Sequence, residues 1–115
     1  MRKAFILSSC NTCQRILKEI SWSDDIQNIK DKNIDAKTLD MIANKLGGYE
    51  ALFSKRAMKY RTMGLNEMEL SDKDLRAYIL EEYTFLKRPV FLIDDQVFAG
   101  NSKKVVEAIK DALST

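Results

Sequence analysis

Histidine is absent from this chain of 115 residues, and cysteine occurs only twice, at Cys10 and Cys13. A structural zinc site takes four ligands, most of them cysteine or histidine side chains. The two cysteines supply at most half of such a site, so carboxylates or a second chain would have to complete it. We therefore expect no metal centre and look for another role for the cysteine pair.

Long apolar runs are also missing. No stretch approaches the roughly 18 apolar residues of a membrane-spanning helix. The apolar run that follows the basic residues Arg2 and Lys3 covers only residues 4–7, whereas a signal peptide carries about 7–15 apolar residues. We expect a cytoplasmic protein that contacts no membrane. In that reducing compartment, a close pair of cysteines is catalytic more often than structural.

Neither sign of charge dominates, because the net charge at neutral pH is only +2. A strongly basic chain would indicate binding to nucleic acid or to an anionic membrane surface, and we expect neither. The length predicts one domain, and a chain of this size buries about two thirds of its unfolded surface, which suffices for a single core.

The two cysteines stand three positions apart, directly after a short apolar run. Residues 3–7 predict a buried strand, and residues 11–20 predict a helix whose apolar face comprises Cys13, Ile16, Leu17 and Ile20. Cys10 then lies at the strand-to-helix turn, where unpaired backbone N–H groups and the helix dipole favour a thiolate. Since the thiolate is the nucleophile, this position indicates thiol redox chemistry at Cys10.

The cysteine pair has alternative interpretations. Cys13, on the apolar face, is equally well explained as a small buried hydrophobic residue. A phosphatase-type loop needs five residues between the cysteine and an arginine, but only four separate Cys10 from Arg15, so that interpretation is rejected. A second thiol three residues away can also reach Cys10, and we expect a reversible disulfide between the two.

The rest of the chain predicts an order of β-α-β, a helical middle and β-β-α. Further elements are expected at about 25–29, 36–46, 49–53 and 72–82, then as a hairpin of strands at 90–93 and 96–99, and as a final helix after Ser102. We expect an α/β fold with a small mixed sheet, flanking helices and a helical insertion at about 36–86.

Two basic segments lie outside the cysteine motif. Residues 54–61 carry four basic side chains, which form either a solvated face or an anion-binding patch near the thiol. Arg88 precedes Pro89, the only proline, which stands directly before the expected strand at 90–93. Proline is tolerated there because its missing N–H need not interrupt the sheet.

Together, these features resemble the arsenate reductase (ArsC)/Spx family over nearly the whole chain. The resemblance implies a single thioredoxin-like domain over residues 1–115, with Cys10 as the nucleophile and Pro89 as the cis-proline of that fold. Arg88 matches the arginine that lines the oxyanion site, and Arg56 matches the arginine of the insertion in the Spx-like branch. We also expect Asn11 and Thr12, between the two cysteines, to contact the substrate.

The chain also departs from the arsenate reductases. Those enzymes place their insertion arginine where Ser54 stands here. The glutaredoxin-linked enzymes carry a third arginine after the last strand, where residues 98–101 contain none, and they lack the second cysteine. Cys13 instead matches the CxxC motif of Spx. The chain therefore resembles the Spx/arsenate-reductase-like branch, and we expect weak or absent reduction of arsenate.

Two functional hypotheses follow from the resemblance. The first is a monomeric thiol oxidoreductase in which Cys10 attacks an oxyanion or a disulfide. Cys13 or glutathione then resolves the adduct, with glutathione, glutaredoxin or thioredoxin as reductant and no bound cofactor. The second is an Spx-like regulator that binds RNA polymerase and uses the cysteine pair as a redox switch. A thioredoxin-fold protein without redox turnover is a third alternative.

Overall fold

A computed structural model describes residues 1–114 of the chain. The chain divides into two compact units: the sheet unit, made of residues 1–32 together with the chain from Arg88 onward, and the helical unit, residues 33–87. The predicted α/β class is confirmed. Among the described residues, no helix combines the length and apolar character needed to cross a bilayer.

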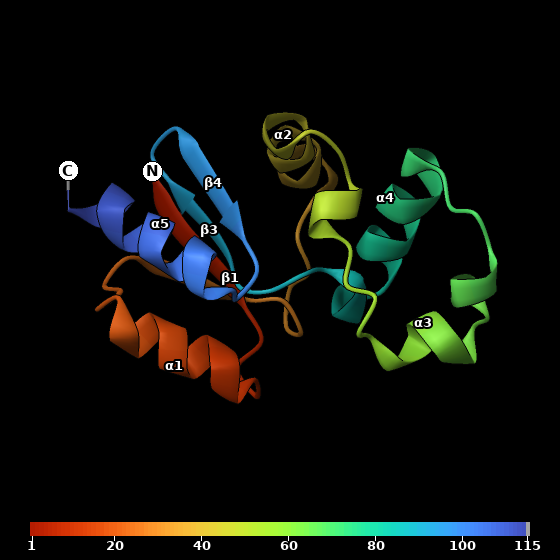
Figure 1. The fold of residues 1–115 in the computed structure, drawn as a ribbon, viewed down its shortest axis with the longest axis horizontal. Coiled ribbons are helices and arrows are strands. Elements are labelled where there is room, and N and C mark those ends of the chain that lie inside the picture. The colour runs from red at the N-terminus through yellow and green to blue at the C-terminus, as the bar shows by residue number, and fades with distance from the viewer. Residues whose placement is uncertain (115) are drawn as a thin grey trace. The chain divides into compact units, whose positions relative to one another are not determined.

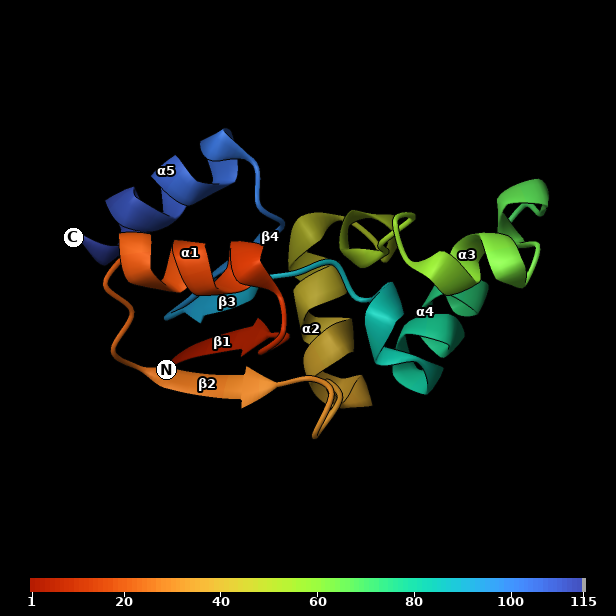
Figure 2. The same cartoon turned by 90° about the horizontal axis from the view of Figure 1, so that it is seen from below.

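The sheet unit is built on a mixed four-stranded sheet of order β2-β1-β3-β4 (Figure 1). The central strand β1 (Arg2–Ile6) runs parallel to β2 (Asp25–Asn28) and antiparallel to β3 (Val90–Ile93). Strand β4 (Gln96–Ala99) completes the predicted hairpin with β3. Both α1 (Asn11–Glu19) and α5 (Lys103–Leu113) cover the same face of this sheet (Figure 2).

The core of the sheet unit lies between that face and the two helices. Alternate residues of β1 and β3 point into it, as the twofold period of strands requires. The buried cluster consists of Ala4, Ile6, Cys13, Ile16, Ile20, Phe91, Ile93, Val106, Ile109 and Ala112. Trp22 packs edge-on against Phe91, with the ring centroids 5.0 Å apart. The predicted apolar face of the first helix is therefore the face that anchors it.

The helical unit contains three α-helices: α2 (Ala36–Leu46), α3 (Met58–Thr62) and α4 (Asp72–Glu81). Single 3-10 turns lie at η1 (Glu50–Leu52), η2 (Leu65–Glu67) and η3 (Tyr83–Phe85). Phe53 and Phe85 stack with their centroids 5.2 Å apart, and Leu39, Ile42 and Ile79 are fully buried.

Side-chain caps set the ends of the helices. Asp35 accepts the Thr38 N–H at the start of α2, and Gly47, with φ of 90°, ends that helix in the left-handed conformation that glycine adopts without strain. Ser71 and Asp74 form the predicted capping box of α4. Ser102 caps α5 in the same way.

The observed boundaries differ from the expected ones by about one residue. The first strand ends at Ile6 rather than at Leu7, because the Leu7 carbonyl accepts the Cys10 N–H and the chain turns there. Helix α3 begins inside the basic segment 54–61 and ends directly after it. The sequence analysis predicted no helix or strand for this segment.

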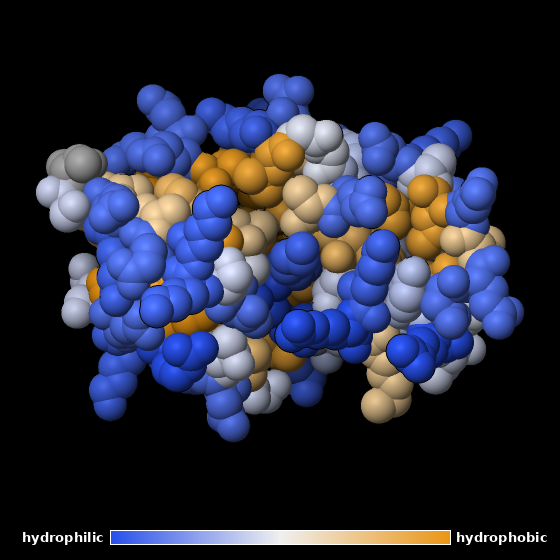
Figure 3. Space-filling model, in the orientation of Figure 1, coloured by the Kyte–Doolittle hydropathy of each residue, from blue (hydrophilic) through white to orange (hydrophobic). Residues whose placement is uncertain are grey.

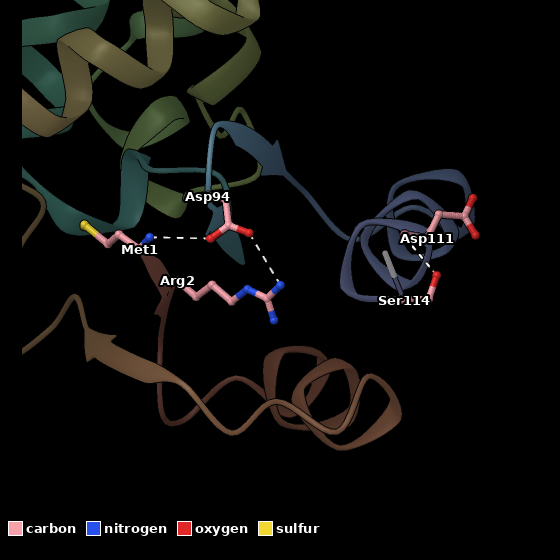
Figure 4. A network of polar contacts seen from close by, with 5 residues as sticks. All are labelled: Met1, Arg2, Asp94, Asp111 and Ser114. Carbon is pink, nitrogen blue, oxygen red and sulfur yellow. Dashed lines mark hydrogen bonds and ion pairs between the residues drawn. The ribbon is translucent and has the colours of Figure 1, made fainter.

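Polar contacts tie the beginning of β1 to the hairpin. Asp94, in the β3–β4 turn with φ of 56°, accepts hydrogen bonds from the Met1 amino group at 3.5 Å and from Arg2 Nη2 at 3.4 Å (Figure 4). Such exposed ion pairs contribute little to stability.

Hydrophilic residues cover much of the face seen in Figure 3. The large apolar side chains exposed among the described residues are Met1, Ile26, Met41, Met58, Met63 and Met68.

Candidate active site

Cys10 is the N-cap residue of α1. The turn after β1 closes with a hydrogen bond of 2.9 Å from the Cys10 N–H to the Leu7 carbonyl. Cys10 is extended, with φ of −87° and ψ of 112°, and its Sγ accepts the Cys13 N–H at 3.4 Å. The sulfur thus takes the place that the oxygen of serine or aspartate usually takes at a helix N-terminus.

The surroundings of Cys10 favour its thiolate. Partial burial of the sulfur raises its pKa, but hydrogen bonds from the N–H and side chain of Cys13 and from the N–H of Thr12 lower it. The positive charge of Arg88 lowers it further. The net effect is a pKa below the ordinary value of a thiol, so the thiolate population at neutral pH increases.

The Cys13 thiol has the opposite character. Its complete burial in the core raises its pKa to about 11, and the hydrogen bond to Cys10 and the charge of Cys10 raise it too. Cys13 is therefore protonated at neutral pH and can donate its S–H to the Cys10 thiolate. Both thiols are free in this structure.

Arg88 and Pro89 belong to the same unit as the cysteines. The peptide bond between them is cis, as the resemblance implied for Pro89, whose carbonyl accepts the Gly100 N–H at 2.9 Å. Arg88 is half-buried, and its charge lowers the pKa of both thiols. The guanidinium is thus within electrostatic reach of the reactive sulfur.

The other predicted site residues are less tightly defined. Asn11 and Thr12 form the first turn of α1, where Asn11 is exposed and Thr12 is half-buried. Arg56 is exposed and lies in the helical unit, between η1 and α3. Its role in binding an anion therefore stays a prediction.

One polar residue near the cysteine loop escaped the sequence analysis. Asn28, at the end of β2, binds Ser8 through both ends of its side-chain amide. The sequence signal that could have found Asn28 is its position at the end of a strand that runs parallel to the strand before Cys10. Loops that follow neighbouring parallel strands meet at one edge of the sheet.

Comparisons with known proteins found similarity over most of the chain. A model described as the ArsC family matches residues 5–109. A relative in Haemophilus influenzae, an uncharacterized protein, is 25% identical over 105 residues, which are 89% of this chain and 92% of the relative.

Solved structures show the same thioredoxin-like fold. The YFFB protein has a TM-score of 0.83 and 18% identity, over 98% of this chain and 99% of its own. An arsenate reductase from Vibrio cholerae has a TM-score of 0.76 and 18% identity, over 92% of this chain and 95% of its own. At such identities the likeness establishes the fold alone.

Proposed function

This chain belongs to the ArsC family, and on that basis we propose that it is a thiol-dependent oxidoreductase with Cys10 as its nucleophile. The observation that carries the proposal is the capped sulfur of Cys10, which accepts the Cys13 N–H and lies within reach of the Arg88 charge. A buried, protonated second thiol stands one helical turn further on. This asymmetry supports an attacking role for Cys10 and a resolving role for Cys13.

The first step is attack of the Cys10 thiolate on one sulfur of a substrate disulfide. A new bond forms between Cys10 and that sulfur, and the other sulfur leaves as a thiolate. The negative charge thus passes from Cys10 to the leaving group. Arg88, whose charge acts on Cys10, is the candidate to stabilise an anionic leaving group or substrate.

The second step is attack on the Cys10 sulfur by Cys13 or by an external thiol such as glutathione. Once Cys10 carries a covalent partner, the charge and hydrogen bond that raised the pKa of Cys13 are gone, and burial is the main remaining cause. Cys13 then loses its proton more readily, attacks Cys10 and expels the substrate sulfur as a thiolate. The resulting disulfide is returned to two thiols by glutathione, glutaredoxin or thioredoxin.

An oxyanion substrate uses the same nucleophile. With arsenate, the Cys10 thiolate forms a sulfur–arsenic bond as an arsenate hydroxyl takes up a proton from solvent and leaves as water. Attack by a second thiol on the Cys10 sulfur then releases the arsenic with an additional electron pair, as arsenite. Each turnover oxidises two thiols to one disulfide and reduces As(V) to As(III). Arg88 is the candidate guanidinium for the oxyanion, through its planar pair of N–H donors.

The test is to trap the covalent intermediate with purified protein. Cys13→Ser removes the resolving thiol, so incubation with glutathione disulfide should yield a stable mixed disulfide at Cys10, located by peptide mass spectrometry. Cys10→Ser serves as the matched control and should remain unmodified. Absence of the adduct on Cys10 in Cys13→Ser would sink the proposal.

The second candidate function is redox-dependent regulation of transcription, as in Spx. Its supporting observation is the second cysteine, since Cys13 completes the CxxC motif that resembles that branch. The same trapped variant, applied to a cell lysate, separates the two. Glutathione, glutaredoxin or thioredoxin on Cys10 supports the enzyme, whereas retention of RNA polymerase by the oxidised wild-type chain supports the regulator.

A further inference from the structure

Asn28 ends β2 beside the loop that carries Cys10. Its register partner in the parallel pair is Ile6, the last residue of β1, so both strands end at the same edge of the sheet. From this edge the chain leaves β1 toward the cysteine motif. A polar side chain in this position can hold the cysteine loop in place.

All four hydrogen-bonding positions of the Asn28 amide are occupied. Its Oδ1 accepts the backbone N–H of Ser8 and that of Lys30, each at 3.3 Å. Its Nδ2 donates to Ser8 Oγ at 2.9 Å and to Asp31 Oδ2 at 3.3 Å. Since a backbone N–H only donates and a carboxylate only accepts, these partners fix the direction in which the amide faces. Asn28 thus holds Ser8 by both its backbone and its side chain.

Ser8 is also held from α1. Its carbonyl accepts Gln14 Nε2 at 3.2 Å, and the next turn closes with the bond from the Cys10 N–H to the Leu7 carbonyl. The loop between β1 and α1 is therefore held by Asn28 at the end of β2 and by Gln14 of α1. Its shape determines where the Cys10 sulfur lies relative to the Cys13 N–H.

We propose that Asn28 is a positioning residue, which holds Ser8 so that the Cys10 sulfur stays on the N-terminal N–H groups of α1. The inference rests on the proposed role of Cys10 as nucleophile. Because water can replace hydrogen bonds at this edge, their net contribution to stability is small. A displaced sulfur, by contrast, loses the directional N–H contacts that favour its thiolate. Loss of Asn28 therefore changes the reactivity of Cys10 more than it changes the stability of the fold.

The test is the pH dependence of iodoacetamide alkylation of Cys10, measured in the Cys13→Ser background. Asn28→Ala should raise the midpoint by about 0.5–1 pKa unit, which is roughly a three- to tenfold slower reaction below the midpoint. Ser8→Ala removes only the Oγ contact and should give a smaller rise. In the Asn28→Ala background it should add nothing, because that contact is already lost. Asn44→Ala, at an exposed position of α2, is the matched control.

The outcomes separate the inference from the proposed function. An Asn28→Ala protein that melts at lower temperature but keeps the parent midpoint would overturn the positioning role. The positioning role would also be overturned if the midpoint shifts of Asn28→Ala and Ser8→Ala were fully additive in the double variant. If Asn28→Ala does not fold, Ser8→Ala decides alone, since an unshifted midpoint overturns the inference and a raised one supports it. A parent Cys10 that titrates like an ordinary thiol would instead contradict the proposed function.

Discussion

At the scale of single residues, two thiols three positions apart have opposite acid–base character. Cys10 caps a helix and is partly exposed, while Cys13 points into the core. In Cys13→Ser, where the serine hydroxyl still donates to the sulfur, alkylation of Cys10 should have a midpoint below 9.0, the ordinary value. In Cys10→Ser, burial should keep the midpoint of Cys13 above 9.0. Iodoacetamide kinetics followed by mass spectrometry measure both.

In the wild-type protein, a pKa below 9.0 for Cys10 and of about 11 for Cys13 predict that Cys10 reacts at least about tenfold faster at neutral pH, because only the thiolate attacks. Unfolding in denaturant should abolish the difference, since it comes from the fold and not from the local sequence. Faster labelling of Cys13 in the folded protein would reverse the assignment of the two roles.

Arg88 acts on Cys10 through its charge, and we propose that it binds an oxyanion through the planar geometry of its guanidinium. Arg88→Ala should raise the pKa of Cys10, but by less than about one unit, since several hydrogen bonds to the sulfur remain. Turnover of an oxyanion should fall by roughly ten- to a hundredfold, the scale of one lost charge-assisted hydrogen bond.

The conservative variant separates these two effects of Arg88. Arg88→Lys should restore the pKa of Cys10 but not the oxyanion turnover, because an ammonium group lacks the planar pair of donors. Unchanged alkylation and turnover in both variants would reduce Arg88 to a surface charge.

At the scale of elements, caps explain where the helices begin. Ser71→Ala removes one half of the α4 capping box and should lower the free energy of unfolding by about 1 kcal/mol. Urea unfolding followed by circular dichroism measures the change. Ser23→Ala, at an exposed position outside the helices, is the control and should cost less than about 0.5 kcal/mol.

Acid should weaken the capping box largely alike in wild type and in Ser71→Ala, because the Ser71 N–H that Asp74 accepts is a backbone group that the substitution keeps. Only the smaller part that comes from the Ser71 side chain should make the stability difference between the two proteins shrink in acid. Hydrogen bonds from Ser71 hold the pKa of Asp74 below its ordinary value of 3.8, so the stabilisation is present above that value. It is lost as the pH falls through the lower pKa of the folded state. A difference between Ser71→Ala and wild type that grows in acid would argue against the capping box.

The order of the strands and of the longer helices could be predicted from the sequence because their signals are local. Apolar periodicity predicts α1 and α5. The capping residues Asp35, Ser71 and Ser102 predict where α2, α4 and α5 begin. Helix α3 lacks such signals, since it is short, has no buried residue and has no side-chain cap.

The residues of the candidate site also differ in whether a local sequence signal predicts them. Cys10 and Cys13 stand out in the sequence because their spacing is local, and Arg88 and Pro89 follow from the resemblance. Asn28 could not be found in this way, because its partner Ser8 lies 20 residues earlier and only strand register brings the two together. Hydrogen bonds between distant segments leave no periodic trace.

At the scale of the whole molecule, the substrate is the decisive question. We expect arsenate turnover far below that of a dedicated arsenate reductase. Ser54 stands where those enzymes place an arginine, and residues 98–101 lack their third one. Two lost contacts of about 1.5–3 kcal/mol each correspond to several powers of ten if both act in the transition state. Exchange with small disulfides needs no oxyanion pocket and should persist.

A coupled assay with arsenate, glutathione, glutaredoxin and NADPH measures the first activity, and a small disulfide in place of arsenate measures the second. Wild-type arsenate turnover equal to that of a dedicated reductase would show that Lys55, Arg56 or Arg61 already supplies the missing guanidinium or charge.

The sulfur cap of α1 also has an electrochemical consequence. Cys10 can cap the helix as a thiolate, but a sulfur in a disulfide bears no negative charge and accepts the Cys13 N–H less strongly. Formation of the predicted disulfide should therefore weaken a helix cap, and its reduction should restore it. If the difference is about 1 kcal/mol, the reduction potential lies about 20 mV above that of an uncapped pair. The cap on α1 should thus make the predicted disulfide easier for glutathione, glutaredoxin or thioredoxin to reduce.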